Sequence, residues 1–394
     1  MKKTLIALAA MAATGAFAQS TVTISGMLDA GLAISTSGAN VQTTTLASGQ
    51  LSGTRLRFVG VEDMGGGSKA TFWLEMQPNM VDGGTSGNGL FNRNAWLGLS
   101  GGWGELRLGR QATTTAIIAC TISFDPAGCA GGFGAGGVLI SGSGAAASGG
   151  GNWIAATPSR AGAGLALSAI GGGFNGQPVA PAVAGTSPGA NAATVTTSAQ
   201  DVTRVVRAVS YLSPNMSGFT AQVQYAFGGV AGASGDGSTT GLLAAYANGP
   251  VWAALAYSSV TGTAASPASG TLTTLSGSYD FGMAKLGLIY QKEGAAGNGG
   301  AFAVTFTDAT AYALTASVPL GAARIYGRFG NRTVSGGTNT LGTIAQMVNI
   351  GATYDLSKRT RLYADYVVDT APGQTGVMAT TNPTQLGMGI EHLF

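Results

Sequence analysis

The chain has 394 residues, of which 45% are hydrophobic and only 9% are charged, and its formal net charge is +3. Because soluble domains carry about 25% charged residues, this composition argues against an ordinary soluble protein. Without the two lysines at its start, the 19 basic residues become 17, against 16 acidic ones, so the charge predicts no nucleic-acid partner.

Residues 1–18 are predicted to be a secretory signal peptide. Two lysines precede a short apolar stretch at residues 5–13, and the Ala-Phe-Ala sequence at 16–18 is typical of a cleavage site. We therefore expect the exported protein to comprise residues 19–394. The apolar stretch is too short to cross a bilayer, and no later stretch supplies the roughly 18 uninterrupted apolar residues that a transmembrane helix needs.

Apolar and polar residues alternate along many short stretches of the chain. Val223, Tyr225 and Phe227 share one face of a predicted strand, and Gln222 and Gln224 share the other. Abundant glycine and serine can also indicate disorder, but the regular β-branched and aromatic alternation argues against it. An exported chain with little charge and this alternation fits a barrel with an apolar exterior and a polar lumen. The sequence therefore predicts an all-β transmembrane barrel.

Short turns alternate with long connections, which favours an antiparallel up-and-down barrel with short periplasmic turns and long external loops. Counting hairpins predicts 16 strands, or 18 if a further pair lies within residues 112–200. Either number leaves a water-filled channel. The short turns are predicted at 63–68, 101–104, 213–217, 248–250 and 355–360, and the long segments at 35–50, 229–239, 261–270, 294–308, 332–343 and 370–383.

Several motifs in the same order resemble the Gram-negative general porins of the type common in β-proteobacteria. The matching residues are 52–67, 91–99, 108–111, 210–219 and the terminal Phe394. The resemblance implies a 16-stranded barrel in the outer membrane, usually a homotrimer, with its third loop folded into the lumen.

In porins of this type, arginines on the barrel wall face acidic groups on the third loop. The resemblance carries this role to Arg55, Arg93, Arg110 and Arg204. Arg57 lies two residues from Arg55, so we expect it to share that face and join the lumen. Arginine stays charged and binds anions through its planar fork, and a ring of such charges selects ions by sign. The alternative is that these arginines only fill a polar lumen or pair with nearby acids.

Residues 112–200 are expected to form an extended third loop that narrows the lumen. Asp125 is the one acidic residue in this segment, so the constriction should be positively charged and prefer anions. The alternative is an extra hairpin within the segment, which would give 18 strands and make Arg160 the wall arginine. Arg207 lies three residues from Arg204, on the opposite face, and is not assigned to the constriction.

Cys120 and Cys129 are the two cysteines of the chain, and both lie in this loop. An exported protein matures in an oxidising compartment, so they are predicted to form a disulfide that limits the motion of the loop. Zinc is a poor alternative, because two cysteines without a nearby histidine do not complete a tetrahedral site.

These observations predict a passive diffusion channel for small hydrophilic solutes and anions, with no cofactor. A substrate-specific channel for a sugar or a phosphorylated solute is the alternative, and Trp73 and Tyr363 could then face the lumen. An enzyme is disfavoured, because hydrolytic barrels generally need a histidine base. The one histidine is His392, which shares parity with the outward-assigned Met388 and Ile390.

The expected partners also follow from the resemblance. Membrane lipid and two further copies of the chain should surround the barrel, and Trp96, assigned to the outward face, is compatible with either contact. Phe394 resembles the C-terminal signal that the barrel-assembly machinery reads.

Overall fold

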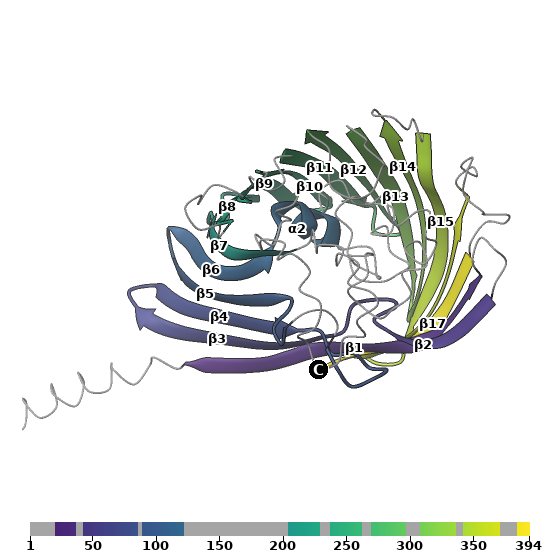
Figure 1. Cartoon of the computed structure of the whole chain (residues 1–394). Helices are drawn as coiled ribbons and strands as arrows, with labels where there is room; N and C mark the ends of the chain where they lie inside the picture. Colours follow the sequence, from purple (N-terminus) through teal and green to yellow (C-terminus); the bar gives the residue numbers. More distant parts are fainter. Residues whose placement is uncertain are drawn as a thin grey trace, which may run out of the picture.

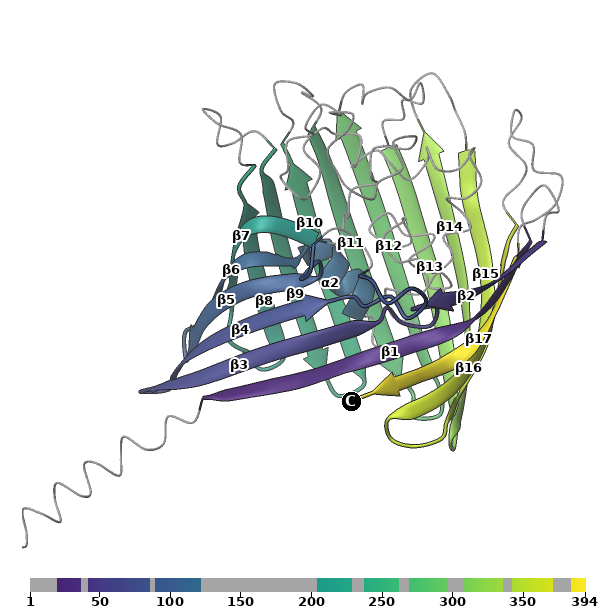
Figure 2. The ribbon, with the colours of Figure 1, turned by 60° about the horizontal axis from the view of Figure 1, so that its bottom comes forward.

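The computed structural model describes residues 20–36, 42–85, 89–121, 204–228, 237–261, 269–296, 308–335, 342–370 and 384–394. They form one antiparallel sheet that closes on itself where β1 pairs with β17 (Figures 1 and 2). The predicted signal peptide, residues 1–18, lies outside the described residues. Among the described residues, the structure contains no helix with the length and apolar character needed to cross a membrane.

Apart from β2 and β3, each strand is hydrogen-bonded to its neighbours along the chain, and most strands have the roughly nine or more residues needed to span a bilayer when tilted. Their bounds are β1 Thr21–Thr36, β2 Gln42–Ser48, β3 Arg55–Gly65, β4 Ser68–Met76, β5 Asn94–Gly101, β6 Gly104–Ala112, β7 Arg204–Leu212, β8 Phe219–Ala226, β9 Thr239–Asn248, β10 Val251–Val260, β11 Ser269–Asp280, β12 Lys285–Ala296, β13 Asp308–Leu320, β14 Ala323–Ser335, β15 Gly342–Asp355, β16 Thr360–Asp369 and β17 Thr384–Leu393.

The strands β2 and β3 are two parts of one interrupted strand. Residues 30–36 of β1 pair with β2, whereas residues 21–27 of β1 pair with β3, and both partners lie along β1 in Figure 2. The barrel therefore has 16 strands, as predicted. The described sheet has no further strand between β6 and β7, because these two strands pair directly with each other, from Glu105↔Leu212 to Ala112↔Arg204.

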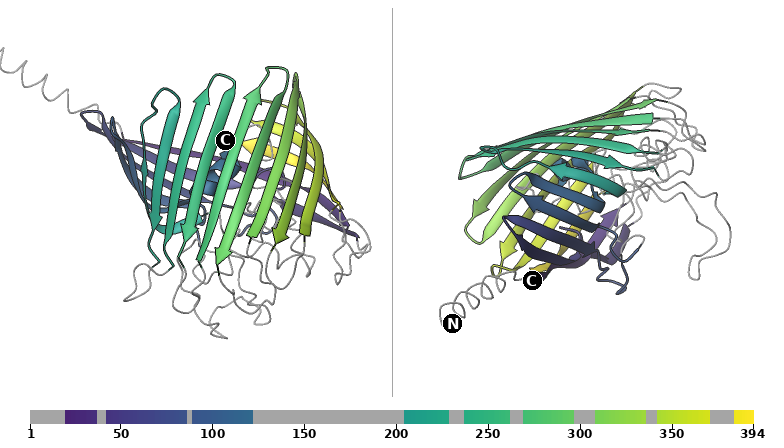
Figure 3. Two further views of the ribbon diagram at one scale, coloured as in Figure 1. Left: turned by 90° about the horizontal axis from the view of Figure 1, so that it is seen from above. Right: turned by 90° about the vertical axis from the view of Figure 1, so that its left-hand side faces the viewer.

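The short turns gather at one end of the barrel, as Figure 3 shows, and the alternation of short and long connections is confirmed. The tight connection between β3 and β4 runs through Gly65, Gly66 and Gly67, whose φ angles are 80°, 62° and 79°. Only glycine adopts three successive left-handed conformations without strain. This glycine run therefore sets the register of the β3–β4 hairpin.

The two faces of the sheet have the predicted polarity. On β8, Val223 faces outward with 50% of its surface exposed, whereas the inward-facing Gln224 is 1% exposed. Large apolar side chains such as Leu97, Leu255 and Leu288 are exposed on the outer surface of the isolated chain. Because a lipid bilayer would cover these side chains, their exposure fits a barrel in a membrane.

The single described helix, α2 (Thr114–Thr121), lies inside the ring of strands (Figure 1). The hydroxyl of Thr114 is 3.1 Å from Ser258 Oγ and donates to the Tyr257 carbonyl on β10 at 3.3 Å. Ala116 and Ile118 are buried. The loop that follows β6 therefore enters the lumen, as predicted, and begins against the inner wall of β9, β10 and β11.

Candidate pore constriction

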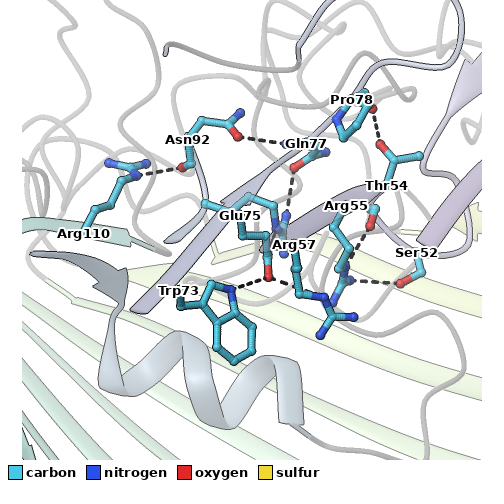
Figure 4. Close-up of polar contacts among 12 residues, drawn as sticks. Ser52, Thr54, Arg55, Arg57, Trp73, Glu75, Gln77, Pro78, Asn92 and Arg110 are labelled. Carbon is cyan, nitrogen blue, oxygen red and sulfur yellow. Dashed lines mark hydrogen bonds and ion pairs between the residues drawn. The ribbon is translucent and has the colours of Figure 1, made fainter. Parts of the chain in front are cut away.

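A single carboxylate, Glu75 on β4, lies at the centre of a group of arginines on the inner wall (Figure 4). Its Oε1 is 2.5 Å from Arg93 Nε, and its Oε2 is 3.9 Å from Arg57 Nε. The indole nitrogen of Trp73 donates to Oε2 at 3.1 Å. Only 3% of Glu75 is exposed, so these contacts replace the water that the carboxylate would otherwise bind.

Arg55 is held by the short segment 49–54 that separates β2 from β3. Its Nε donates to the Gly53 carbonyl at 3.0 Å, and its Nη2 donates to Ser52 Oγ at 3.2 Å (Figure 4). Two acceptors on one guanidinium restrict both its position and its orientation. The position of the Arg55 guanidinium in the lumen therefore depends on where segment 49–54 lies.

A chain of hydrogen bonds connects Arg93 with Arg110. Arg93 Nη1 donates to Gln77 Oε1 at 2.8 Å, the Gln77 backbone N–H donates to Asn92 Oδ1 at 3.1 Å, and Arg110 Nε donates to the Asn92 carbonyl at 2.7 Å. Arg110 thus lies beside the group around Glu75 and is linked to it through Asn92 (Figure 4).

Arg204, at the start of β7, completes the group. It is almost fully buried and lies close enough to interact electrostatically with Arg55 and Glu75. Arg207 is separate from it, because its guanidinium donates to the carbonyls of Phe227 and Gly228 at 3.2 and 2.9 Å. We refer to Arg55, Arg57, Arg93, Arg204 and Glu75 as the arginine cluster.

The structure thus brings together four of the five arginines that the sequence assigned to one site, and it places the fifth beside them. Asp125, Cys129 and Arg160 lie outside the described residues. Cys120 lies in α2, but its side chain is likewise outside what the structure describes. The disulfide and the acidic loop group therefore stay predictions.

Sequence reasoning missed Glu75. The signal was present, because the tight glycine turn sets the β3–β4 register and that register places Glu75 directly opposite Arg57. Glu75 also shares its face of β4 with Trp73, two residues before it. The two-residue period of β4 and the register of the β3–β4 hairpin together could have identified Glu75 as the carboxylate that faces Arg57.

The outward assignment of Trp96 is wrong. Its side chain is 6% exposed and lies inside the barrel, where its ring centroid is 6.0 Å from that of Trp73 and 4.4 Å from the Arg107 guanidinium carbon. The next residue, Leu97, faces outward instead. An aromatic stacked under a guanidinium is stable in a polar lumen, so tryptophan alone is a weak indicator of the lipid face.

His392 lies where its parity predicts, on the outer surface. Its Nδ1 is 2.9 Å from Thr360 Oγ1, and the neighbouring outward residues Met388 and Ile390 are exposed. The C-terminal Phe394 pairs with Gly26 through two backbone hydrogen bonds of 3.0 and 3.2 Å, which close the sheet beside β1.

A closed 16-strand barrel with an apolar exterior, a polar inner wall and a helix inside the lumen defines a channel of the outer membrane. The sequence profile described as Gram-negative porin matches residues 4–373. The chain therefore belongs to the Gram-negative porin family and is a protein of the bacterial outer membrane.

Relatives align along the whole chain. It is 30% identical to outer membrane porin protein 32 of Delftia acidovorans and 28% identical to an outer membrane porin protein of Bordetella pertussis, in each case over 100% of both chains. The solved structure of the anion-selective porin from Comamonas acidovorans shares 26% identity and a TM-score of 0.67, covering 95% of this chain and 100% of that one. OmpT of Vibrio cholerae, at 14% identity and a TM-score of 0.58 over 95% and 98%, shares the fold.

Proposed function

We propose that this porin is a passive diffusion channel for small hydrophilic solutes that prefers anions, and that the arginine cluster sets the preference. One observation carries the proposal: Arg93 and Arg57 contact Glu75, and Arg55 and Arg204 lie within electrostatic range of the same carboxylate, so four guanidinium groups surround it. The excess positive charge lies on the wall of β3–β7, and the loop that follows β6 begins with α2, which packs against the inner wall of β9–β11. Solutes would pass between them.

The likeness to a structure titled an anion-selective porin supports this proposal. So does the chemistry of arginine, which stays charged at every relevant pH and offers several N–H donors to an anion. Arg110 would add a further positive charge at the edge, and Asp125 would subtract one from the loop.

The proposal is tested by the reversal potential of the purified protein in a planar bilayer under a salt gradient. The unchanged protein should give stepwise currents with an anion-favouring potential. Arg55→Gln and Arg93→Gln should each lower the ratio of anion to cation permeability. Arg207→Gln is the matched control, because it removes an arginine outside the cluster. A cation-favouring potential of the unchanged protein would contradict the proposal.

A substrate-specific channel is favoured by one observation, the two tryptophans inside the barrel. Trp73 and Trp96 form a pair on the inner wall, with Arg57 5.8 Å from the Trp73 ring and Arg107 over Trp96. Sugars and other ring-shaped solutes stack on such surfaces. A specific channel would show saturable current block by its solute, and this block would weaken in Trp73→Leu.

Assembly is proposed on the porin resemblance. We expect a homotrimer, which chemical cross-linking of the detergent-extracted protein would reveal as a three-chain species. Recognition by the barrel-assembly machinery through Phe394 would be tested by deleting that residue and measuring the amount of folded barrel in the outer membrane.

A further inference from the structure

Segment 49–54 folds into the lumen because it has four more residues than the stretch of β1 it faces. Pairing of β1 with β2 ends at Ala30↔Ser48 and pairing with β3 begins at Met27↔Arg55, so six residues lie opposite Leu28 and Asp29. Leu51 is fully buried. A backbone that leaves the sheet must find new hydrogen-bond partners, and lipid offers none. The segment can therefore be satisfied only on the inner side.

Asp29 supplies those partners. Its Oδ2 accepts hydrogen bonds from the backbone N–H groups of Leu51 at 2.8 Å and Ser52 at 2.7 Å, and its own carbonyl accepts from the Gly49 N–H at 2.9 Å. The Asp29 side chain is completely buried. One side chain therefore holds the middle of the inward segment.

Tyr363 holds Asp29 in turn. It belongs to β16, and its hydroxyl donates to Asp29 Oδ1 at 2.7 Å after crossing β17. The crossing depends on Gly389 and Gly31, which are paired with each other. A Cβ at either position would lie 2.5 or 2.6 Å from the Tyr363 hydroxyl, closer than real side chains approach. Because Gly31 and Gly389 have no side chain, the Tyr363 hydroxyl has room to reach Asp29.

The neighbouring wall repeats this arrangement. Tyr326 on β14 crosses Gly351 on β15 and bonds the carboxyl group of Asp365 on β16. A Cβ at Gly351 would overlap the Tyr326 ring. Leu51 packs with Tyr326 and Tyr363 in one buried apolar group. The second tyrosine therefore supports Leu51 by contact, whereas the first also reaches the backbone of the segment through Asp29.

We propose that Asp29 and Tyr363 are positioning residues for Arg55, and that this link across the β17–β1 closure tunes the ion selectivity of the pore. The connection is continuous: Tyr363 holds Asp29, Asp29 holds Leu51 and Ser52, and Ser52 with Gly53 holds the Arg55 guanidinium. The inference rests on the proposed function, because it requires that Arg55 contributes to selectivity.

The test compares two substitutions of Asp29 by reversal potential. Asp29→Asn removes the acid but keeps an oxygen that can accept from the two N–H groups, with its amide turned toward the Tyr363 oxygen. Asp29→Ala removes the acid and the link. Relative to Asp29→Asn, we expect Asp29→Ala to lower the anion preference by about half of the shift that Arg55→Gln causes, because the charge is displaced rather than deleted.

Tyrosine variants supply the matched pair. Tyr363→Phe keeps the ring over Gly389 and removes the bond to Asp29, so its anion preference should fall in the same direction as in Asp29→Ala. Tyr326→Phe removes the equivalent hydroxyl from the neighbouring wall and should leave the reversal potential unchanged. Equal shifts in both variants would overturn the positioning role, because they would indicate a general loosening of the barrel.

A second measurement reports the segment directly. In a background with Cys120 and Cys129 changed to serine, Leu51→Cys should react slowly with a charged maleimide. Reaction should become at least several-fold faster when Asp29→Ala is added, and should stay slow with Asp29→Asn. If Leu51→Cys reacts slowly when combined with either Asp29→Ala or Asp29→Asn, the proposed link between Asp29 and segment 49–54 is wrong. This conclusion holds even if one variant gives too little folded protein for current recordings.

The outcomes separate the two hypotheses. If Arg55→Gln leaves the reversal potential unchanged, the proposed role of Arg55 fails and the positioning role fails with it. If Arg55→Gln shifts the potential while Asp29→Ala and Asp29→Asn agree, only the positioning role fails. If Asp29→Ala and Asp29→Asn still differ in reversal potential when Arg55 is already glutamine, the link acts through another group and the inference is wrong.

Discussion

Two walls of the barrel use arginine in different ways. On β3–β7, the arginine cluster has four guanidinium groups around Glu75. On β14–β17, Arg361 Nε is 2.7 Å from Glu391, a buried carboxylate that also lies within electrostatic range of Arg55, and Arg328 stacks on Tyr326 at 5.0 Å. A paired arginine contributes little net field to the lumen, whereas an arginine that shares its acid does. Charge balance, rather than the number of arginines, distinguishes the two walls.

The largest expected effect comes from removing two charges of the cluster together. Arg55→Gln with Arg93→Gln should abolish most of the anion preference, because Glu75 would then offset half of the remaining cluster charge. The reversal potential under a salt gradient measures this effect. An unchanged potential in the double variant would show that selectivity arises elsewhere, and the comparison between the walls would lose its functional meaning.

On the opposite wall, Arg361→Gln should affect stability instead. It leaves Glu391, which is fully buried, without its cation, and breaking such a pair costs about 3 kcal/mol. The temperature at which the folded barrel unfolds in detergent should fall. Adding Glu391→Gln should recover part of the lost stability, and this double variant, which removes one charge of each sign, should keep the reversal potential close to that of the unchanged protein. A large change in selectivity would contradict the conclusion that Arg361 contributes to stability rather than to ion selection.

Removing Glu75, the acid of the arginine cluster, should change the anion preference less than the double arginine variant does, and in the opposite direction. Glu75→Gln keeps one acceptor oxygen for Arg93 but deletes the negative charge, so the anion preference should rise. The rise should be greatest at low salt, because the Debye length falls from about 30 Å at 0.01 M to about 3 Å at 1 M. Glu105→Gln is the control, since Glu105 pairs with Arg107 at 2.7 Å outside the cluster. Equal effects of both would argue against a localised selectivity site.

The smallest effect is expected at the wall that carries α2. Thr114→Val removes the hydroxyl that contacts Ser258 and the Tyr257 carbonyl, and a hydrogen bond of this kind contributes about 1 kcal/mol. The start of the loop should loosen, so single-channel currents should become noisier without a shift in reversal potential. Thr115→Val is the comparison in the same helix, because it removes a hydroxyl that contacts Thr113 at 3.3 Å rather than β10. Noise of equal size in both variants would show that the contact with β10 is unimportant.

Much of the fold was predictable because a barrel wall repeats one simple rule. Side chains alternate between lipid and lumen, so the parity of Val223 and Gln224 assigned their faces correctly, and the short turns determined which strands pair. Trp96 shows the limit of this reasoning. Its ring is compatible with lipid in isolation, and only the positions of Trp73 and Arg107 make the inner face favourable.

The sequence alone determined the transmembrane barrel and the candidate set of arginines, because period, turn spacing and recognisable motifs are local properties of the chain, whereas the choice of 16 strands over 18 needed the direct pairing of β6 with β7. Only the tertiary structure decided how those arginines are balanced and held. The register places Glu75 opposite Arg57, and closure of the barrel brings Tyr363 to Asp29, which are 334 residues apart. Such contacts depend on which strands meet across the sheet, and the electrostatic field inside a pore depends on those distances rather than on composition.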